Sequence, residues 1–568
     1  MRRFELLKPS LRSDQLNLQK KRRATSRTKG MDKMKRIISI ILLISVVTSC
    51  LYLSSCAFLE NLISKDNGGD EEEKVTLNII DDSYRNWYEI FVYSFYDTNN
   101  DGIGDLNGVT EKLDYIQEMG FNGIWLMPIH PSPTYHKYDV TDYYAIDSDY
   151  GTLEDFKRLV DEAHKRGIRI IIDLVVNHTS DSHPWFKAAC EYIKSNGKPG
   201  GEYGEFYNFK QGGTTGAYHS VSGTPYAYEG QFWSGMPDIN LDSEKVRDEI
   251  RNIMKYWLET YDVDGFRLDA VTSYYTGNIP KNVDFLSWIN TEAKKIKPSA
   301  YIVGEAWVGD DYTINRYYQS GCDSFFLFTG SQAGGSIASA VKMCSGKMVG
   351  NLFTRLQETY GDAVLAPFLG NHDTMRPGSF MPGVENLKMA AGVLSMMNGG
   401  TFVYYGEEIG MISKGGNNSD PAKRIAMKWK EKSIYEGCCY LPPENTPVDD
   451  TSYHYPSVEE QMADPDSILN YYKEAMELRN RFPSIARGTV TYYPEGNSNY
   501  ICVITKEYEG EKITIVFNMD SFEQKAILDK EALGFTELVG ELYAAGGEFS
   551  YDEDGNLIMP GQSIAIFK

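Results

Sequence analysis

The sequence predicts an α/β fold: a (β/α)8 TIM barrel with a small domain inserted after strand 3 and a C-terminal antiparallel β-domain. Three observations support this prediction. Short apolar segments alternate with amphipathic helices from residue 87 onward, one connection is much longer than the rest, and short alternating runs begin near Gly488. Eight strands joined mostly by helical crossovers close most simply as a barrel.

Eight segments have the pattern of barrel strands. The third is nearly all apolar, as expected for a parallel strand buried on both faces. In the fourth, Phe266, Leu268 and Ala270 alternate with polar residues, and Gly265 separates the strand from the preceding helix. In chain order the segments are 87–95, 123–128, 168–176, 263–270, 301–304, 324–328, 364–369 and 401–405.

Two connecting helices carry recognisable start signals. One follows Thr152, where Asp155 completes a capping-box pattern, and Gly167 ends it. The other follows Ser243. Both have apolar residues at the spacing of one buried helix face, namely Phe156, Leu159, Val160 and Ala163 in the first, and Val246, Ile250, Ile253 and Trp257 in the second.

The connection between His178 and Asp238 shows no clear strand–helix unit and is rich in Gly, Tyr and Trp. A loop of this size inside a compact domain is usually functional, so we expect a small inserted domain. The predicted boundaries are 81–178 and 239–486 for the barrel, 179–238 for the insertion, and 487–568 for a C-terminal β-sandwich.

The N-terminal residues have the pattern of an export signal. A basic stretch at 34–36 precedes an apolar run at 37–47 that is too short to span a membrane comfortably. Two segments ending in Cys50 and Cys56 resemble the lipobox of bacterial lipoproteins, the second more closely. We expect lipidation at Cys56, with Cys50 as the alternative. Residues 1–56 are then the export segment and 57–80 a flexible acidic tether; a plain secretory signal is the competing interpretation.

The charge distribution bounds partners and location. The formal net charge is −22, and residues 1–36 carry 13 Lys and Arg against 3 Asp and Glu, which leaves −32 for the remainder. A strongly acidic surface disfavours nucleic acid and favours calcium, neutral substrates and solubility outside the cell. We expect a monomeric, extracellular, cell-surface lipoprotein of a bacterium, attached to the membrane only through its lipid anchor, or alternatively a fully secreted protein. The cysteines beyond the signal show no CxxC pair, and no disulfide is predicted.

Polar residues follow the predicted carboxyl ends of several strands, where barrel enzymes place their chemistry. Arg267 and Asp269 are two residues apart on one strand and therefore lie side by side. Taken alone, such a pair is more often a structural ion pair. Its occurrence together with similar residues on successive strands favours function; the others are His178, Glu305, His372 and Asp373.

Five segments in order resemble glycoside hydrolase family 13, the alpha-amylase family, and the resemblance runs from about residue 85 to the C-terminus. They are 173–178, 236–240, 265–269, 303–307 and 370–373. The resemblance implies that Asp269 is the catalytic nucleophile and Glu305 the general acid/base. It also implies that Asp373 is a third carboxylate, which holds sugar hydroxyls and stabilises the transition state.

The same resemblance implies a set of substrate-binding residues. Arg267, His178 and His372 would line the subsite of the reacting sugar. Tyr138 and Asp139 resemble the loop of this family whose tyrosine stacks on that sugar, although ordinary loop chemistry is an alternative for these two.

The physical chemistry agrees with the catalytic roles. A carboxylate beside a guanidinium stays ionised, which suits an attacking Asp269. Glu305 lies between Gly304 and Ala306, an apolar setting that would raise its pKa toward neutrality, as a proton donor requires. A retaining glycosidase holds two such carboxyl groups about 5–5.5 Å apart.

A second cluster predicts a calcium site. In residues 97–105, oxygen ligands recur at alternate positions with glycine at the sixth, as in the first half of a calcium loop. Position twelve is Gly108, where an EF-hand needs glutamate, so paired helices are not expected. An Asx-rich turn without metal is the alternative. The candidate ligands are Asp97, Asn99, Asp101, Ile103 and Asp105.

The expected activity is hydrolysis of internal α-1,4 bonds in starch or maltodextrins, since Ala270 after the nucleophile resembles members with that preference. An α-glucosidase or a 4-α-glucanotransferase acting on malto-oligosaccharides is the closest alternative. Thr272 and Ser273 replace a Lys-His pair that many alpha-amylases carry, which leaves the leaving-group side open. A non-catalytic surface glucan-binding protein is the alternative of a different class, and the presence of all three carboxylates disfavours it.

Overall fold

The structure is a computed structural model that describes residues 83–413, 420–431, 436–441, 443 and 456–568. The predicted export segment 1–56, the lipidation at Cys56 or Cys50 and the tether 57–80 lie outside the described residues. Across the described ranges, no helix is both long and apolar enough to cross a membrane.

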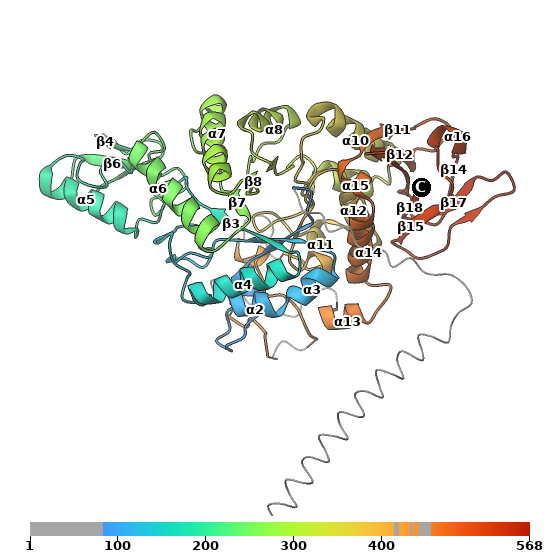
Figure 1. Ribbon diagram of the computed structural model, residues 1–568, viewed down its shortest axis with the longest axis horizontal. Coiled ribbons are helices and arrows are strands. Elements are labelled where there is room, and N and C mark those ends of the chain that lie inside the picture. The colour runs from blue at the N-terminus through green and yellow to red at the C-terminus, as the bar shows by residue number, and fades with distance from the viewer. Residues whose placement is uncertain (1–82, 414–419, 432–435, 442, 444–455) are drawn as a thin grey trace, which may run out of the picture. The chain divides into compact units, whose positions relative to one another are not determined.

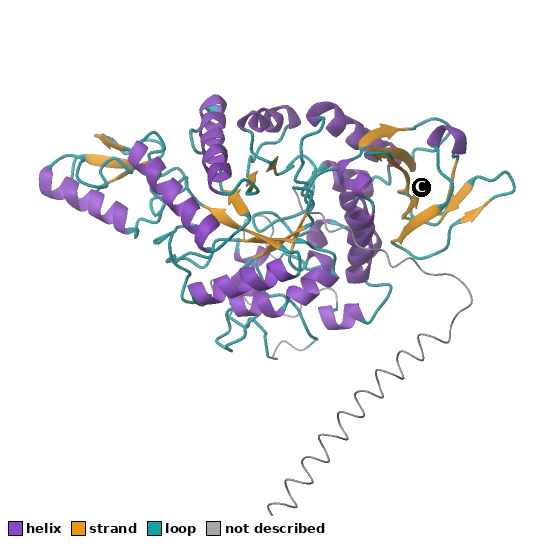
Figure 2. Ribbon diagram, viewed as in Figure 1, coloured by secondary structure: helices purple, strands orange, loops and turns teal. Residues whose placement is uncertain are grey.

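Parallel strands form the core of the molecule in the predicted barrel arrangement (Figures 1 and 2). One sheet has the order β10-β1-β2-β3-β7-β8-β9. From β1 to β9 its neighbouring strands follow the order of the chain, and β10, the last strand, lies beside β1, as it must when a barrel closes. Two single bridges, from Phe326 to Ala366 and from Phe368 to Phe402, insert the eighth segment between β9 and β10. The barrel prediction is therefore confirmed. The strands are β1 Trp87–Ile90, β2 Gly123–Leu126, β3 Arg169–Leu174, β7 Gly265–Leu268, β8 Tyr301–Gly304, β9 Ser324–Phe325 and β10 Phe402–Tyr404.

The strand predicted for residues 87–95 is too long. β1 ends at Ile90, and a 3-10 turn, Val92–Ser94, follows it. The carbonyls of Tyr93 and Tyr96 accept hydrogen bonds from the backbone N–H groups of Gly104 and Asp105, so this segment pairs with the next loop and not with a strand. Its side chains are mostly buried, which explains why the apolar pattern alone resembled a longer strand.

Aromatic side chains fill much of the barrel interior. Trp87 stacks between Tyr301 and Phe402, with ring centroids 4.9 and 5.7 Å apart. Trp125 and Phe326 belong to the same buried cluster. Packing of the barrel therefore accounts for part of the high aromatic content, as large rings bury more apolar area than aliphatic side chains.

Helices surround the barrel, and the predicted start signals differ in outcome. The capping box of Thr152 and Asp155 is present at the start of α4, whereas Ser243 precedes α6 without a side-chain cap bond. The helices are α2 Leu106–Glu111, α3 Leu113–Glu118, α4 Leu153–Lys165, α6 Glu244–Lys255, α7 Ile279–Ile296, α8 Asp311–Tyr317, α9 Ser336–Lys342, α10 Gly346–Tyr360, α11 Pro377–Phe380, α12 Val384–Ser395, α13 Val458–Met462, α14 Ile468–Arg481 and α15 Pro483–Arg487.

The long connection after β3 does contain regular structure, contrary to the expectation of no clear strand–helix unit. It holds a helix, α5 Pro184–Asn196, and a small antiparallel sheet of β4 Phe209–Gln211, β5 Tyr218–Ser220 and β6 Tyr226–Glu229. His183 caps α5, and proline stands at its start. A bridge between His178 and Asp238 joins the two ends of the connection, which keeps it over the barrel rim.

The C-terminal residues form two antiparallel sheets. The larger has the order β11-β12-β13-β18-β15 and the smaller β14-β17-β16. Ile501 and Val516 of the larger sheet share one buried cluster with Leu557 and Met559 of the smaller sheet, as the two layers of a sandwich do. The elements are β11 Thr489–Tyr492, β12 Ile501–Tyr508, β13 Glu511–Asn518, β14 Gln524–Ala526, α16 Lys530–Leu533, β15 Leu538–Tyr543, β16 Ser550–Tyr551, β17 Leu557–Met559 and β18 Ser563–Phe567.

Candidate active site

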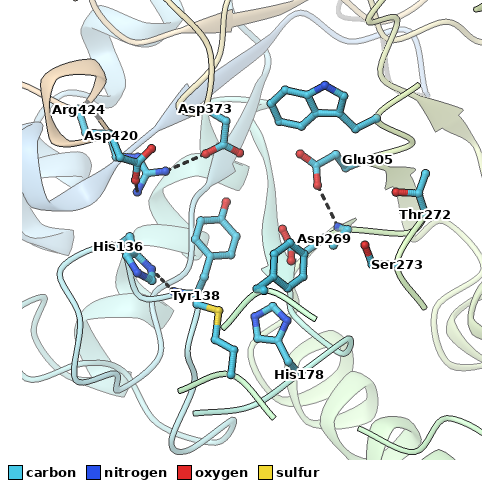
Figure 3. Close-up of a pocket in the computed structure, with 14 residues that line it drawn as sticks. His136, Tyr138, His178, Asp269, Thr272, Ser273, Glu305, Asp373, Asp420 and Arg424 are labelled. Carbon is cyan, nitrogen blue, oxygen red and sulfur yellow. Dashed lines mark hydrogen bonds and ion pairs between the residues drawn. The ribbon is translucent and has the colours of Figure 1, made fainter. Parts of the chain in front are cut away.

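A cavity of about 580 Å³ opens among the loops that follow the barrel strands (Figure 3). Five of the residues predicted from the sequence line it: Tyr138, His178, Asp269, Glu305 and Asp373. The structure therefore brings together the carboxylates of three different strand ends at a single cavity.

Arg267 lies beneath this cavity and contacts three carboxylates. Its Nη1 is 2.5 Å from Asp173 Oδ1 and 2.7 Å from Asp269 Oδ1, and its Nη2 is 3.0 Å from Glu305 Oε1. The strand register explains the first contact, since Asp173 on β3 pairs directly with Arg267 on β7. Arg267 is fully buried, so its charge is screened little by solvent. Burial raises the pKa of Asp173 and of Glu305, and the charge of Arg267 opposes this rise in both.

Glu305 differs from Asp269 in its surroundings. Its Oε2 accepts a hydrogen bond of 2.9 Å from the backbone N–H of Ala270, shown dashed in Figure 3. Burial raises the pKa of Glu305 to about 7; the charge of Arg267 opposes this rise, and the charges of Asp269 and Asp373 add to it. Glu305 can therefore hold a proton near neutral pH and release it, as a general acid must.

Asp373 has the opposite character. Its two oxygens lie 2.8 Å from Arg424 Nη2 and 2.9 Å from His372 Nε2. Burial raises the pKa of Asp373, but the charges of His372 and Arg424 outweigh burial, and the net effect is a pKa well below the usual range. His372 is held in place by Glu89 on its other ring nitrogen, at 2.5 Å. Asp373 is thus an anion within a hydrogen-bonded network.

The backbone after β7 is strained. Ala270 has φ +49°, in the left-handed region that non-glycine residues rarely adopt. This turn directly follows Asp269 and directs the Ala270 N–H to Glu305. Strain of this kind persists only where surrounding contacts hold it, and it is frequent at functional sites.

The predicted substrate-binding residues are placed differently from one another. Tyr138 lines the cavity, stacks on His372 with ring centroids 5.5 Å apart, and contacts His372 Nε2 through its hydroxyl at 2.8 Å. His178 also lines the cavity, and its buried Nε2 has no hydrogen-bond partner in the protein, so it is available to a ligand. His372 and Arg267 lie behind the lining residues.

Asp139 does not line the cavity. It is buried and accepts hydrogen bonds from the hydroxyls of Ser132, at 2.7 Å, and Thr134. These bonds close the loop that carries Tyr138, so the structure assigns Asp139 to shaping the loop. The sequence pattern placed Asp139 beside Tyr138 correctly but could not show which of the two faces the cavity.

Several cavity residues were not identified from the sequence. Arg424 and Asp420 lie on the connection after β10 and form an ion pair of 3.1 Å. Because they follow the strand by many residues, reading the strand ends could not find them. His136 lines the same wall, and Phe232 and Met236 reach the cavity from the inserted region.

The loop predicted to bind calcium is closed by its own hydrogen bonds. The Asp97 carboxylate accepts from the backbone N–H groups of Asn99, Asn100 and Gly102, and the Asp105 carboxylate caps α2 through Gly108. Nowhere in the described part of the chain do three or more His, Cys, Asp or Glu side chains gather closely enough to hold a metal ion. The donors are all oxygens, the type that Ca²⁺ prefers, so the residue types fit although the structure shows no assembled site.

Comparison with known proteins identifies the family. A model of the alpha amylase catalytic domain matches residues 89–488. The chain is 36% identical over 457 residues to alpha-amylase 3 of Dictyoglomus thermophilum, which covers 78% of this chain and 86% of the relative. It is 31% identical to an oligo-1,6-glucosidase of Parageobacillus thermoglucosidasius, covering 76% of this chain and 89% of the relative.

Among solved structures, Eubacterium rectale Amy13B superimposes with a TM-score of 0.81 and 43% identity, over 86% of this chain and 96% of that one. The fold, the placement of the carboxylates and these similarities agree. The chain belongs to the alpha-amylase family of glycoside hydrolases.

Proposed function

We propose that this enzyme hydrolyses internal α-1,4-glucosidic bonds in starch or maltodextrins and retains the anomeric configuration. The observation that carries the proposal is the pairing of Asp269 with Glu305. Both carboxyl groups contact one guanidinium, that of Arg267, and both line one cavity. Burial raises the pKa of Glu305 to about 7, so this group can be protonated at the start of a cycle.

In the first step, an Asp269 oxygen attacks the anomeric carbon while Glu305 gives its proton to the glycosidic oxygen. The bond from the anomeric carbon to that oxygen breaks, a glycosyl ester forms on Asp269, and the leaving chain departs with the proton. In the second step, Glu305 takes a proton from water, which attacks the anomeric carbon and releases Asp269. Two inversions restore the α configuration.

The surrounding residues support these steps. Asp373 is held as an anion between Arg424 and His372 and can accept hydrogen bonds from sugar hydroxyls. Asn177 Nδ2 donates to His178 Nδ1, so the unpaired Nε2 of His178 carries a proton and can donate to a sugar hydroxyl. Tyr138 presents a ring held by its stacking on His372, which suits contact with a sugar ring. Hydrogen bonds that strengthen as charge develops at the anomeric carbon lower the barrier.

Specificity within the family is the second part of the proposal. The Dictyoglomus relative is named an alpha-amylase and the Parageobacillus relative an oligo-1,6-glucosidase. The latter similarity favours an α-glucosidase as the second candidate, and transfer to a sugar acceptor needs only that the acceptor replace water. A binding-only role has no support from the site, which retains all three carboxylates.

Replacing Asp269 with asparagine tests the mechanism. The variant keeps the side-chain shape but cannot form the ester, and we expect reducing-sugar release from soluble starch to fall by at least about a thousandfold. Undiminished release would reject the mechanism.

A product profile on amylose, pullulan and maltotriose separates the candidate activities. Mixed short oligosaccharides from amylose would indicate internal cleavage, glucose alone would indicate an α-glucosidase, and redistributed chain lengths would indicate a transferase.

We also propose that the loop 97–105 binds Ca²⁺ through Asp97, Asn99, Asp101, the Ile103 carbonyl and Asp105. Three carboxylates within nine residues repel one another without a cation, so binding would stabilise the loop. A chelator should lower the melting temperature of the wild type and have a much smaller effect on Asp101→Asn. Equal melting with and without chelator would reject the site.

For cellular location, we propose a bacterial cell-surface lipoprotein modified at Cys56, with Cys50 or a plain secretory signal as alternatives. The support is the basic and apolar pattern at 34–47 and the two lipobox-like segments. Metabolic labelling with palmitate should mark the wild type and be lost in Cys56→Ser. Labelling that persists in Cys56→Ser and is lost in Cys50→Ser would assign the modification to Cys50.

A further inference from the structure

A buried carboxylate, that of Glu89, lies beneath the catalytic site and takes no part in the steps above. It stands on β1, two residues after Trp87, so both side chains point into the barrel interior, where the ring of Trp87 packs. We propose that Glu89 is a positioning residue of the reaction: it keeps His372 positively charged, so that His372 donates a hydrogen bond to Asp373 throughout the catalytic cycle. This inference rests on the proposed function and deepens it.

The imidazole of His372 lies between two carboxylates. Its Nδ1 is 2.5 Å from Glu89 Oε1, and its Nε2 is 2.9 Å from Asp373 Oδ2. An ionised carboxylate can only accept hydrogen bonds, whereas a neutral imidazole has one donor nitrogen and one acceptor nitrogen. Both contacts are therefore satisfied together when the ring carries two protons and a positive charge.

The surroundings of the ring show why this charge needs Glu89. Burial lowers the pKa of His372, but the charges of Asp373 and Glu89 outweigh burial and raise the pKa to about 10. Nearby guanidinium groups disfavour a further positive charge on the ring. The other charged or titratable groups that face His372 or its two carboxylates are Tyr138 from the loop after β2, Asp173 from β3, Arg267 from β7, Tyr404 from β10 and Arg424 from the connection after β10.

The two carboxylates that hold His372 differ in access to the substrate. Asp373 lines the catalytic cavity, and its side chain is 28% exposed (Figure 3). Glu89 is 2% exposed and contacts the ring from the side away from Asp373. When sugar hydroxyls share the Asp373 oxygens, the pairing of His372 with Glu89 is unaffected. Glu89 can therefore maintain the charge of His372 while Asp373 binds the substrate.

The orientation of this ring also fixes a second group that faces the cavity. His372 Nε2 lies 2.8 Å from the Tyr138 hydroxyl, and the Tyr138 ring stacks on the imidazole. Trp125 packs edge-on against His372, with ring centroids 5.6 Å apart. A glutamine in place of Glu89 could still hydrogen-bond Nδ1, but it could not stabilise a positive charge. The charge of Glu89 is thus the property to test.

Glu89→Gln keeps the shape of the side chain and removes its charge. This change lowers the pKa of His372, so the ring loses its second proton at a lower pH than in the wild type. On soluble starch we expect kcat/KM to fall less than about threefold at pH 6, and the variant-to-wild-type ratio to fall about tenfold further at pH 8.5, the effect of one lost hydrogen bond to a charged group. An equal ratio at both pH values, lowered or not, would overturn the inference, because a merely structural role does not depend on pH.

His164→Gln is the matched control. His164 Nε2 lies 2.7 Å from Asp264 Oδ2, so this variant also breaks a carboxylate–imidazole pair, but one that lies just before β7 begins, at the opposite end of that strand from Asp269. Its ratio to the wild type should be the same at pH 6 and pH 8.5. A decline with pH as large as that of Glu89→Gln would show that the effect is not specific to His372.

A neutron crystal structure of the wild type at pH 8 locates the protons without any variant. We expect deuterium on both Nδ1 and Nε2 of His372. Deuterium on a single ring nitrogen, or on Glu89 in place of Nδ1, would overturn the inference. If the wild type releases no sugar from starch or malto-oligosaccharides, the proposed function fails, whatever the protons show. If it releases sugar and His372 is neutral, this inference alone fails.

Discussion

Single residues at the carboxyl ends of strands differ in chemistry because their neighbours differ. Asp269 and Glu305 both contact Arg267, but Glu305 also lies against the Ala270 backbone and is 5% exposed. Burial is the largest influence on the pKa of Glu305 and raises it to about 7. Two carboxyl groups on one guanidinium can therefore take the separate roles of nucleophile and acid.

The pKa of Glu305 predicts that both activity and stability fall as pH rises. The proposed mechanism needs the protonated form of Glu305, so kcat/KM should fall as pH rises through about 7.

The free energy of unfolding should also fall as pH rises from about 4.3, the pKa of glutamate in the unfolded chain, to about 7, the pKa of Glu305 in the native state. In that window the native state keeps a proton on Glu305 that the unfolded state has lost. Glu305→Gln should lack this part of the loss and be more stable than the wild type by about 1–3 kcal/mol at pH 8. Urea unfolding at pH 5 and pH 8 measures the difference, and equal pH dependence in both proteins would contradict it.

At the scale of elements, helix starts that look alike in sequence differ in the folded chain. Thr152 accepts a hydrogen bond from the Asp155 backbone N–H, and the Asp155 carboxylate accepts one from the Thr152 backbone N–H. Ser243 makes no such bond, and its buried hydroxyl has no partner. A capping residue stabilises a helix only when its side chain reaches the free N–H groups of the first turn.

Alanine substitutions at these two positions should therefore have unequal effects. Thr152→Ala should cost about 1 kcal/mol of unfolding free energy, the usual value of a lost N-cap. Ser243→Ala should cost less and can be stabilising, because it removes an unpaired buried hydroxyl. Chemical denaturation of the two variants beside the wild type gives the comparison. A larger loss for Ser243→Ala would show that the capping geometry is not what stabilises α4.

At the scale of the whole described chain, two buried basic side chains meet at the end of α12, and one of them, Lys506, joins the C-terminal sheet to the barrel. Lys506 on β12 donates to the carbonyls of Met396 and Ile485 and to Asn398 Oδ1. Arg479 on α14 donates to the Ser395 carbonyl at 2.9 Å, among others. The carbonyls of residues 395 and 396 mark the end of α12, where helices leave acceptors without partners and where positive charge is favourable.

Lys506→Met tests this junction. The apolar chain fills the same space but removes the donor from two buried carbonyls and from the partly buried Asn398 oxygen, so we expect a loss of about 2–4 kcal/mol. Lys525→Met is the control, since Lys525 is half exposed and its 3.5 Å ion pair with Asp552 is of the surface type that contributes little. We expect the melting temperature of Lys506→Met to be lower than that of Lys525→Met. Equal melting temperatures for the two variants would mean that Lys506 does not stabilise the junction.

The sequence by itself determined what short-range physics controls. Apolar periodicity located the strands and the two helices. The spacing of Arg267 and Asp269 predicted that the two charges lie side by side, and they do, at 2.7 Å, although Asp269 lies just beyond the end of β7. Because parallel strands end on one rim, the residues at those ends could be assigned to one region before the fold was known. Glu305 and Asp373, which line one cavity in the structure, were assigned in this way.

Only the tertiary structure decided the contacts between segments distant in the chain. Arg424 reaches Asp373 from 51 positions away, Asp139 lies under its loop while Tyr138 faces the cavity, and two single bridges close the ring of strands. No local pattern encodes these outcomes, because they depend on how loops pack over a completed barrel. The physical reason is range: propensity and periodicity act over a few residues, whereas burial and buried charge depend on every segment that meets at the site.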